Sequence, residues 1–159
     1  MNVSFSTRGW QDKPWETWLD WAETMRFGGI ELYNVQNCPQ LTDRGGALHK
    51  YATAATVRAL REKNIRIPCL DSSCDLTDGQ SAETVRGLIR LAHEIQCPNV
   101  CAVALRDDDA AVHAALRALI PEAEAAGVTI LLKTSGIFAD TARLRAVLDD
   151  FACDQLGAL

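Results

Sequence analysis

Polar and aromatic side chains capable of ligand binding or proton transfer gather at the ends of short apolar stretches of this chain. The set comprises Arg8, Trp10, Glu31, Tyr33, Asp71, Ser72, Lys133 and Ser135. Carboxylates and hydroxyls pair with the hydroxyl groups of a polar ligand, and an aromatic ring covers the apolar face of a sugar-like ring. The mixture predicts a pocket for a small hydroxylated carbonyl compound.

Two of these residues, Glu31 and Lys133, lie on the apolar stretches themselves rather than after them. A charge in such a position is costly to bury and usually has a partner. Moving a proton next to a carbonyl requires a base and a group that stabilises the developing oxyanion. We therefore assign Glu31 and Asp71 as candidate bases and Lys133, or else Arg8, as the stabilising group. The expected substrate-binding residues are Arg8, Trp10, Tyr33, Ser72 and Ser135.

Six strand-like stretches, separated by amphipathic segments of helix length, must position these side chains. We expect strands at residues 3–6, 30–33, 65–70, 100–105, 128–132 and 156–159. The intervening helices are expected at about 14–25 and 52–63 and from about residues 81, 107 and 140. Strands that alternate with helices pair in parallel through right-handed crossovers. The pattern predicts an α/β fold with its chemistry beyond the carboxyl ends of the strands.

Length and charge narrow the class of protein. The 159 residues suit one domain spanning 1–159, shorter than the roughly 200–250 residues of a complete eight-unit barrel. The net charge of −5 arises from interleaved acidic and basic residues, so a nucleic-acid partner is not expected. No apolar run approaches the ~20 residues that span a bilayer, and residues 1–6 do not resemble a signal peptide. We expect no membrane association and a cytoplasmic location.

Other chemical motifs are weak. Six cysteines have no metal-binding spacing, and we expect reduced structural thiols, with Cys74 set apart because it follows a strand-like stretch. We expect the three histidines to be structural or exposed. The chain has no glycine-rich dinucleotide fingerprint and no P-loop.

Several segments resemble the xylose-isomerase-like sugar phosphate isomerase/epimerase family. They are VSFSTRG at 3–9, FGGIEL at 27–32, PCLDSS at 68–73, GIFADTARLR at 136–145 and LGAL at 156–159. The resemblance implies a TIM-type (β/α)8 barrel, incomplete at about five and a half of its eight units. It also implies an isomerase or epimerase of carbohydrate metabolism that acts on a small sugar or sugar phosphate.

One departure from that family concerns its cofactor. Family members generally hold a divalent metal through a glutamate at the end of strand five and through ligands on later strands. Here the strand-five position is Lys133, whose positive charge repels a cation. No cofactor is supported by this chain, and no residue is assigned as a metal ligand.

A second resemblance offers another mechanism. The segment LKTSG at 132–136 is similar to the Schiff-base strand of deoxyribose-phosphate aldolases. This likeness implies a class I aldolase-like enzyme in which the Lys133 amine attacks a carbonyl.

A third hypothesis is a non-catalytic partial barrel, or a subunit that needs a partner. Five or six parallel strands leave two sheet edges unpaired. We also expect apolar side chains to face the uncovered interior, namely Val3, Ile30, Ile67, Val100, Ile130 and Leu156. Both features predict a homo-oligomer or a missing C-terminal half.

Overall fold

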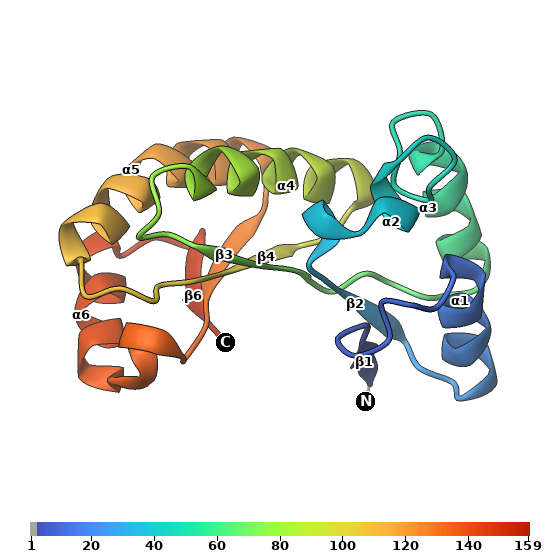
Figure 1. Ribbon diagram of the computed structural model, residues 1–159, viewed down its shortest axis with the longest axis horizontal. Coiled ribbons are helices and arrows are strands. Elements are labelled where there is room, and N and C mark those ends of the chain that lie inside the picture. Colours follow the sequence, from blue (N-terminus) through green and yellow to red (C-terminus); the bar gives the residue numbers. More distant parts are fainter. Residues whose placement is uncertain (1–2) are drawn as a thin grey trace.

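The computed structural model describes residues 3–159 and contains one six-stranded parallel sheet with the strand order β1-β2-β3-β4-β5-β6 (Figure 1). The strands are β1 Ser4–Ser6, β2 Gly29–Tyr33, β3 Leu70–Asp75, β4 Asn99–Val103, β5 Thr129–Leu132 and β6 Leu156–Ala158. Each strand pairs with the next strand along the chain, as in a barrel built from successive βα units. The predicted α/β fold, an incomplete TIM-type barrel, is confirmed.

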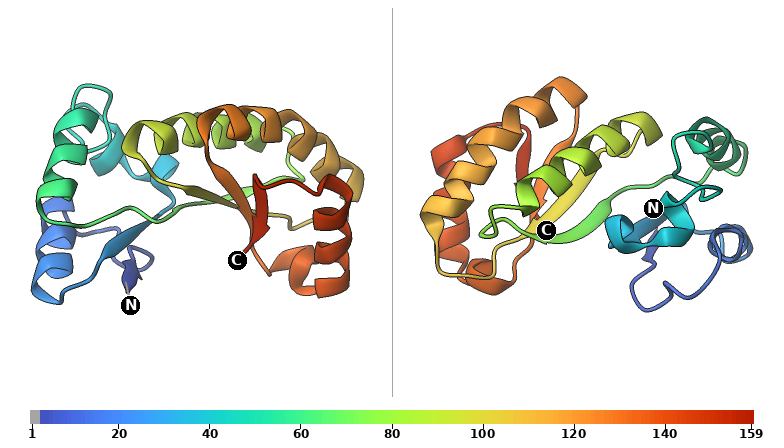
Figure 2. Two further views of the ribbon diagram at one scale, coloured as in Figure 1. Left: turned by 180° about the vertical axis from the view of Figure 1, so that it is seen from behind. Right: turned by 45° about the horizontal axis from the view of Figure 1, so that its top comes forward.

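Helices connect the strands and form an arc around the outside of the curved sheet (Figures 1 and 2). They are α1 Trp15–Thr24, α2 Pro39–Thr42, α3 Thr53–Glu62, α4 Ser81–Ile95, α5 Asp109–Ala126 and α6 Thr141–Phe151, with short 3-10 turns η1 Val35–Asn37 and η2 Gly136–Ala139. The carboxylates of Asp108 and Asp140 cap α5 and α6 by accepting hydrogen bonds from first-turn amides. Sequence predicted the five long helices but neither α2 nor the two 3-10 turns.

The hydrophobic core lies between the sheet and the helices. Ile30, Val100 and Ile130, from β2, β4 and β5, are fully buried and share one cluster with Leu88 of α4 and Leu116 of α5. The expectation that these strand residues face an uncovered interior was wrong. Successive strand residues point to opposite faces, and the apolar set is the one that packs against the helices.

The inner face of the sheet carries the other set of side chains. Tyr33, Asp71 and Cys101 are register partners on neighbouring strands and therefore point the same way. Lys133 follows β5 with the parity opposite to the buried Ile130. The face that the helices leave free thus carries polar side chains near the strand ends.

The third strand begins five residues later than expected. Residues 65–69 lie in the irregular segment before β3, and only Leu70 onward forms the strand. Pro68 cannot donate a hydrogen bond to a neighbouring strand, which accounts for the late start. The shift places Asp71 and Ser72 within the strand rather than after it.

The sheet is open at both ends. Within residues 3–159, β1 pairs only with β2, and β6 pairs only with β5. The two edges lie on the side of the molecule that the helices do not cover (Figure 1). Over the same residues, no helix is long and apolar enough to cross a membrane.

Candidate functional site

A cavity of about 450 Å3 lies at the carboxyl ends of the strands. Residues at or after the carboxyl ends of five of the six strands line it, in agreement with the usual position of sites in parallel α/β folds. The lining residues are Arg8, Ser73, Val103, Leu105, Lys133, Thr134, Ser135 and Leu159. Three expected site residues, Arg8, Lys133 and Ser135, are therefore brought together here.

A buried ion pair between Asp71 and Lys133 borders this cavity. The Lys133 ammonium donates to Asp71 Oδ2, although the two residues are 62 positions apart in sequence and lie on β3 and after β5. The Asp71 side chain is only 4% exposed and that of Lys133 is 18% exposed. The second Asp71 oxygen accepts a 3.3 Å hydrogen bond from the backbone amide of Ser73. An ammonium has three N–H groups, so Lys133 retains donors for a ligand.

The Tyr33 ring is close to both cations of the site. The Arg8 guanidinium is 5.3 Å from the centre of its ring, and the Lys133 ammonium is 5.9 Å from it. Both distances are within the range of cation–π attraction. The Tyr33 backbone amide donates to the hydroxyl of Thr7, which is fully buried. Tyr33 therefore links the loop after β1 to the end of β5.

Two lining residues were not foreseen. Ser73 has a backbone φ of +53°, in the left-handed region that residues other than glycine rarely adopt. Such backbone conformations concentrate at ligand sites. Thr134 lies beside the expected Ser135. Ser73 was not expected in the wall because β3 starts later than predicted, which changes the direction of its side chains. A run of serines and threonines directly after two strands was the available signal.

Three expected site residues lie elsewhere. The Ser72 hydroxyl donates to the Cys101 carbonyl, because Ser72 points to the face opposite to Asp71. The Trp10 ring packs edge-on against Trp21, 5.4 Å away, in an apolar cavity beside α1. Glu31 shares the inner face with Tyr33 but lies two residues deeper along β2, outside the cavity wall.

Asp75 connects the ends of β3 and β4. One of its oxygens accepts hydrogen bonds from the Thr77 amide and hydroxyl and from the Leu105 amide. Burial raises the pKa of Asp75, but these hydrogen bonds outweigh the effect of burial and hold the pKa below its usual value. The carboxylate therefore holds the loop that carries Leu105 at the cavity rim.

The residues present do not fit a divalent cation. Across residues 3–159, no three His, Cys, Asp or Glu side chains are arranged to hold a metal ion. At the strand-five position the Lys133 ammonium already pairs with Asp71, the nearest carboxylate. A cation placed there would be repelled by the ammonium.

Five of the six cysteines are buried, and all six are free thiols. Cys69 and Cys101 have their sulfur atoms 3.1 Å apart on the inner face, and this contact together with burial raises the pKa of Cys69. Cys69 directly precedes β3 and lies two residues before Asp71, the register partner of Cys101. Cys74, set apart on sequence grounds, is buried within β3, and burial raises its pKa as well. Neither property suits a reactive thiolate.

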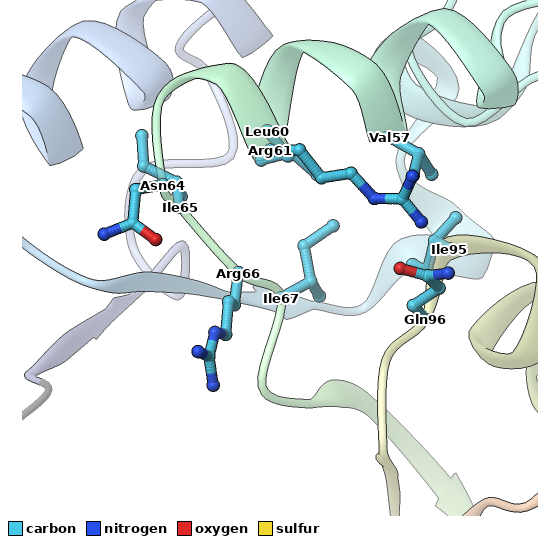
Figure 3. Close-up of a pocket in the computed structure, with 9 residues that line it drawn as sticks. All are labelled: Val57, Leu60, Arg61, Asn64, Ile65, Arg66, Ile67, Ile95 and Gln96. Carbon is cyan, nitrogen blue, oxygen red and sulfur yellow. The ribbon is translucent and has the colours of Figure 1, made fainter.

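A second cavity, of about 380 Å3, lies at the opposite end of the strands (Figure 3). Aliphatic side chains and the polar groups of Arg61, Asn64, Arg66 and Gln96 surround it where α3 and α4 end. Among residues 3–159, no acid, histidine, serine or cysteine lines it. The cavity at the carboxyl ends is therefore the better candidate for chemistry.

Comparison with known proteins finds similarity of structure only. No family model matches the sequence, and no curated protein matches it. The solved structure of the probable 3-DHS dehydratase AsbF from Bacillus anthracis superposes with a TM-score of 0.80 at 15% identity, over 99% of this chain and 62% of that one.

Two further structures give the same picture. The IolI protein, solved with a bound zinc atom, superposes with a TM-score of 0.80 at 15% identity over 99% of this chain and 62% of its own. A xylose isomerase domain protein from Planctomyces limnophilus superposes with a TM-score of 0.72 at 11% identity. The match covers 99% of this chain and 61% of that one. The chain thus spans about three fifths of the length of these structures. Its fold is that of the xylose isomerase-like TIM barrels, of which it forms six strands.

Proposed function

We propose that this chain forms the catalytic end of a sugar isomerase/epimerase-like enzyme that moves a proton next to the carbonyl of a small hydroxylated substrate. The buried Asp71–Lys133 pair at the strand ends carries the proposal. The fold supports it, because solved structures of the same fold include a xylose isomerase domain protein and a D-tagatose 3-epimerase-like protein.

The roles follow from the geometry of the pair. A substrate carbonyl that enters the cavity meets the Lys133 ammonium, whose free N–H groups stabilise the oxyanion formed when the neighbouring carbon loses its proton. Asp71 accepts that proton, because its carboxylate lies directly beside the ammonium that binds the carbonyl oxygen. Glu31, deeper on the same face, is the alternative base. No step requires a metal ion.

The Lys133 amine could also act as a nucleophile. It borders the cavity and contacts a carboxylate able to take its proton. Attack on an aldehyde would form an imine and release water, as in a class I aldolase. Treatment with sodium borohydride and a candidate aldehyde traps such an imine, and a mass increase on the peptide that contains Lys133 would establish this second mechanism.

Proton exchange with solvent tests the first mechanism. The purified protein is incubated in D2O with a panel of small hydroxyaldehydes and hydroxyketones, and deuterium incorporation next to the carbonyl is followed by NMR. Asp71→Asn should lower the exchange rate by roughly 10²–10⁴-fold, the range of general base catalysis. Asp149→Asn is the matched control, because Asp149 is exposed on α6.

Each outcome of this experiment has a meaning. Exchange by the parent protein that Asp71→Asn abolishes and Asp149→Asn preserves supports the proposal. Equal exchange by Asp71→Asn excludes Asp71 as the base. A folded protein that exchanges no member of the panel contradicts the proposal and favours a non-catalytic barrel unit that needs a partner.

A further inference from the structure

The cavity of about 380 Å3 at the amino ends of the strands has an apolar floor and a polar rim (Figure 3). It lies where α3 and α4 end, because within residues 3–159 β3 and β4 pair only from Leu70 and Val100 onward. The aliphatic side chains of the floor are buried, namely Leu60, Ile65, Ile67 and Ile95. The side chains of the rim are exposed, namely Arg61, Asn64, Arg66 and Gln96.

The rim carries positive charge without a counter-charge. Across residues 3–159, neither Arg61 nor Arg66 has a carboxylate within ion-pair distance, and no acidic side chain lines the cavity. Arg61 belongs to the last turn of α3, and its side chain extends across the cavity toward the Gln96 amide (Figure 3). The Arg66 side chain points away from Arg61 (Figure 3). Arg61 is therefore the cation that a ligand in the cavity would meet.

The carboxyl ends of α3 and α4 place partial negative charge beside the same cavity. Backbone amides that follow each helix already bond to its last carbonyls. The Ile65 amide donates to the Leu60 carbonyl at 2.9 Å, and the Cys97 amide donates to the Ala92 carbonyl at 2.8 Å. The full charge of the Arg61 guanidinium exceeds the partial charge of a helix end, so the cavity favours an anion over a cation.

This lining suits a small aliphatic carboxylate. A planar guanidinium presents paired N–H donors that match the two oxygens of a carboxylate, and the Gln96 amide supplies further donors. The buried floor favours a hydrocarbon tail, because burial removes the tail from water. An amino acid fits less well, since its ammonium would find no acidic partner in the lining.

We propose that this cavity is a binding site for a small aliphatic carboxylate, whose charged group pairs with Arg61 and Gln96 while its tail lies on Ile67 and Ile95. The site is at the opposite end of the strands from the candidate active site, and the inference does not depend on the proposed function. A ligand bound here contacts the segment that leads into β3, on which Ile67 precedes Asp71 by four residues.

Three probes separate the contribution of the charge from that of the tail. Isocaproate and isocaproamide differ in charge but hardly in shape, and acetate keeps the charge without the tail. NMR titration of the purified protein should detect saturable binding of isocaproate with a Kd below about 1 mM. Acetate should bind about tenfold more weakly or less, because it buries fewer methylene groups, and isocaproamide should not bind.

The methyl signals identify which cavity is occupied. Those of Ile67 and Ile95 should shift with isocaproate, whereas those of Val103 and Leu105, which line the cavity at the carboxyl ends, should not. Shifts confined to Val103 and Leu105 would overturn the inference.

Two arginine variants of α3 test the anchor. Arg61→Gln should weaken isocaproate binding by about tenfold or more, since it removes a charge-assisted hydrogen bond. Arg58→Gln removes the same charge from an exposed position on the same helix outside the lining, and it should leave binding unchanged.

Several results would overturn the proposed site. They are equal affinity for isocaproate and isocaproamide, equal affinity for isocaproate and acetate, no saturable binding, undiminished binding by Arg61→Gln, and an equal loss in the two variants. Because these titrations involve no turnover, their outcome is independent of the deuterium-exchange experiment.

Discussion

The two faces of the sheet use the same strands for different purposes. Ile30, Val100 and Ile130 point toward the helices and are fully buried. On the inner face, Tyr33, Asp71 and Lys133 form a charged and aromatic group at the strand ends. Adjacent residues of a strand point to opposite faces. A register error of one residue would therefore exchange the helix-facing and the inner-facing side chains.

The difference shows where fold and chemistry are encoded. The outer face depends on shape and apolar area, which many sequences supply. The inner face depends on a few polar groups whose burial is tolerated only because they pair with one another. Changes to the first face should therefore affect stability, whereas changes to the second should affect binding and turnover and also cost stability where they leave a buried charge unpaired.

The helix-facing side is most sensitive at Trp18. This residue is fully buried on α1, and its indole N–H donates to the Trp10 carbonyl at 3.1 Å. Trp18→Ala should lower the free energy of unfolding by about 3–5 kcal/mol, through lost apolar burial and the cavity left behind. Tyr51→Ala, at an 82% exposed side chain, is the control, and urea melts measure both variants. Equal stability of the two variants would contradict the assignment of the outer face as the source of stability.

Asp75 is a polar residue at the strand ends whose role we expect to be structural. Its folded-state pKa is depressed, so its contribution to stability is present above its ordinary value of 3.8 and is lost as pH falls through the folded-state pKa. Asp75→Asn should therefore destabilise the protein at neutral pH and flatten the loss of stability in acid. Melting temperatures recorded between about pH 6 and pH 2 measure this. Parallel pH profiles for the two proteins would show that Asp75 does not hold the ends of β3 and β4 together.

Gly87, remote from both faces, should give the smallest effect. It is exposed within α4, and an added methyl group would meet no atom within 4 Å. Gly87→Ala should stabilise the protein by about 0.5–1 kcal/mol, because alanine restricts the unfolded chain and favours the helix. Gly127→Ala should instead destabilise the protein, because φ is +66° at this position and a side chain there is strained. Thermal melts should move in opposite directions, and a loss of stability in both would be inconsistent with the geometry of α4.

Sequence was sufficient for the fold because hydrophobic periodicity and helix ends are local signals. The helices expected to begin near residues 81, 107 and 140 begin at Ser81, Asp109 and Thr141. The third strand was misplaced because its apolar residues Ile65 and Ile67 are buried in an irregular segment. Periodicity reports burial and does not distinguish a strand from an extended buried loop.

The site was predictable only in part. Lys133 and Asp71 stood out as charges at strand ends, but their pairing across 62 residues depends on tertiary structure. Trp10 lies outside the cavity wall because the loop after β1 turns its ring toward Trp21 of α1. The orientation of Ser72 depended on the register of a strand whose start was misplaced.

A double-mutant cycle on Asp71 and Lys133 tests the central claim most directly. Lys133→Met leaves the buried Asp71 carboxylate without its cation and should cost about 3–5 kcal/mol of stability. Asp71→Asn/Lys133→Met removes both charges and should recover much of that loss, giving a coupling energy of roughly 1–3 kcal/mol in urea melts. Additive losses for the two substitutions would show that the pair does not form. That result would contradict the proposed site.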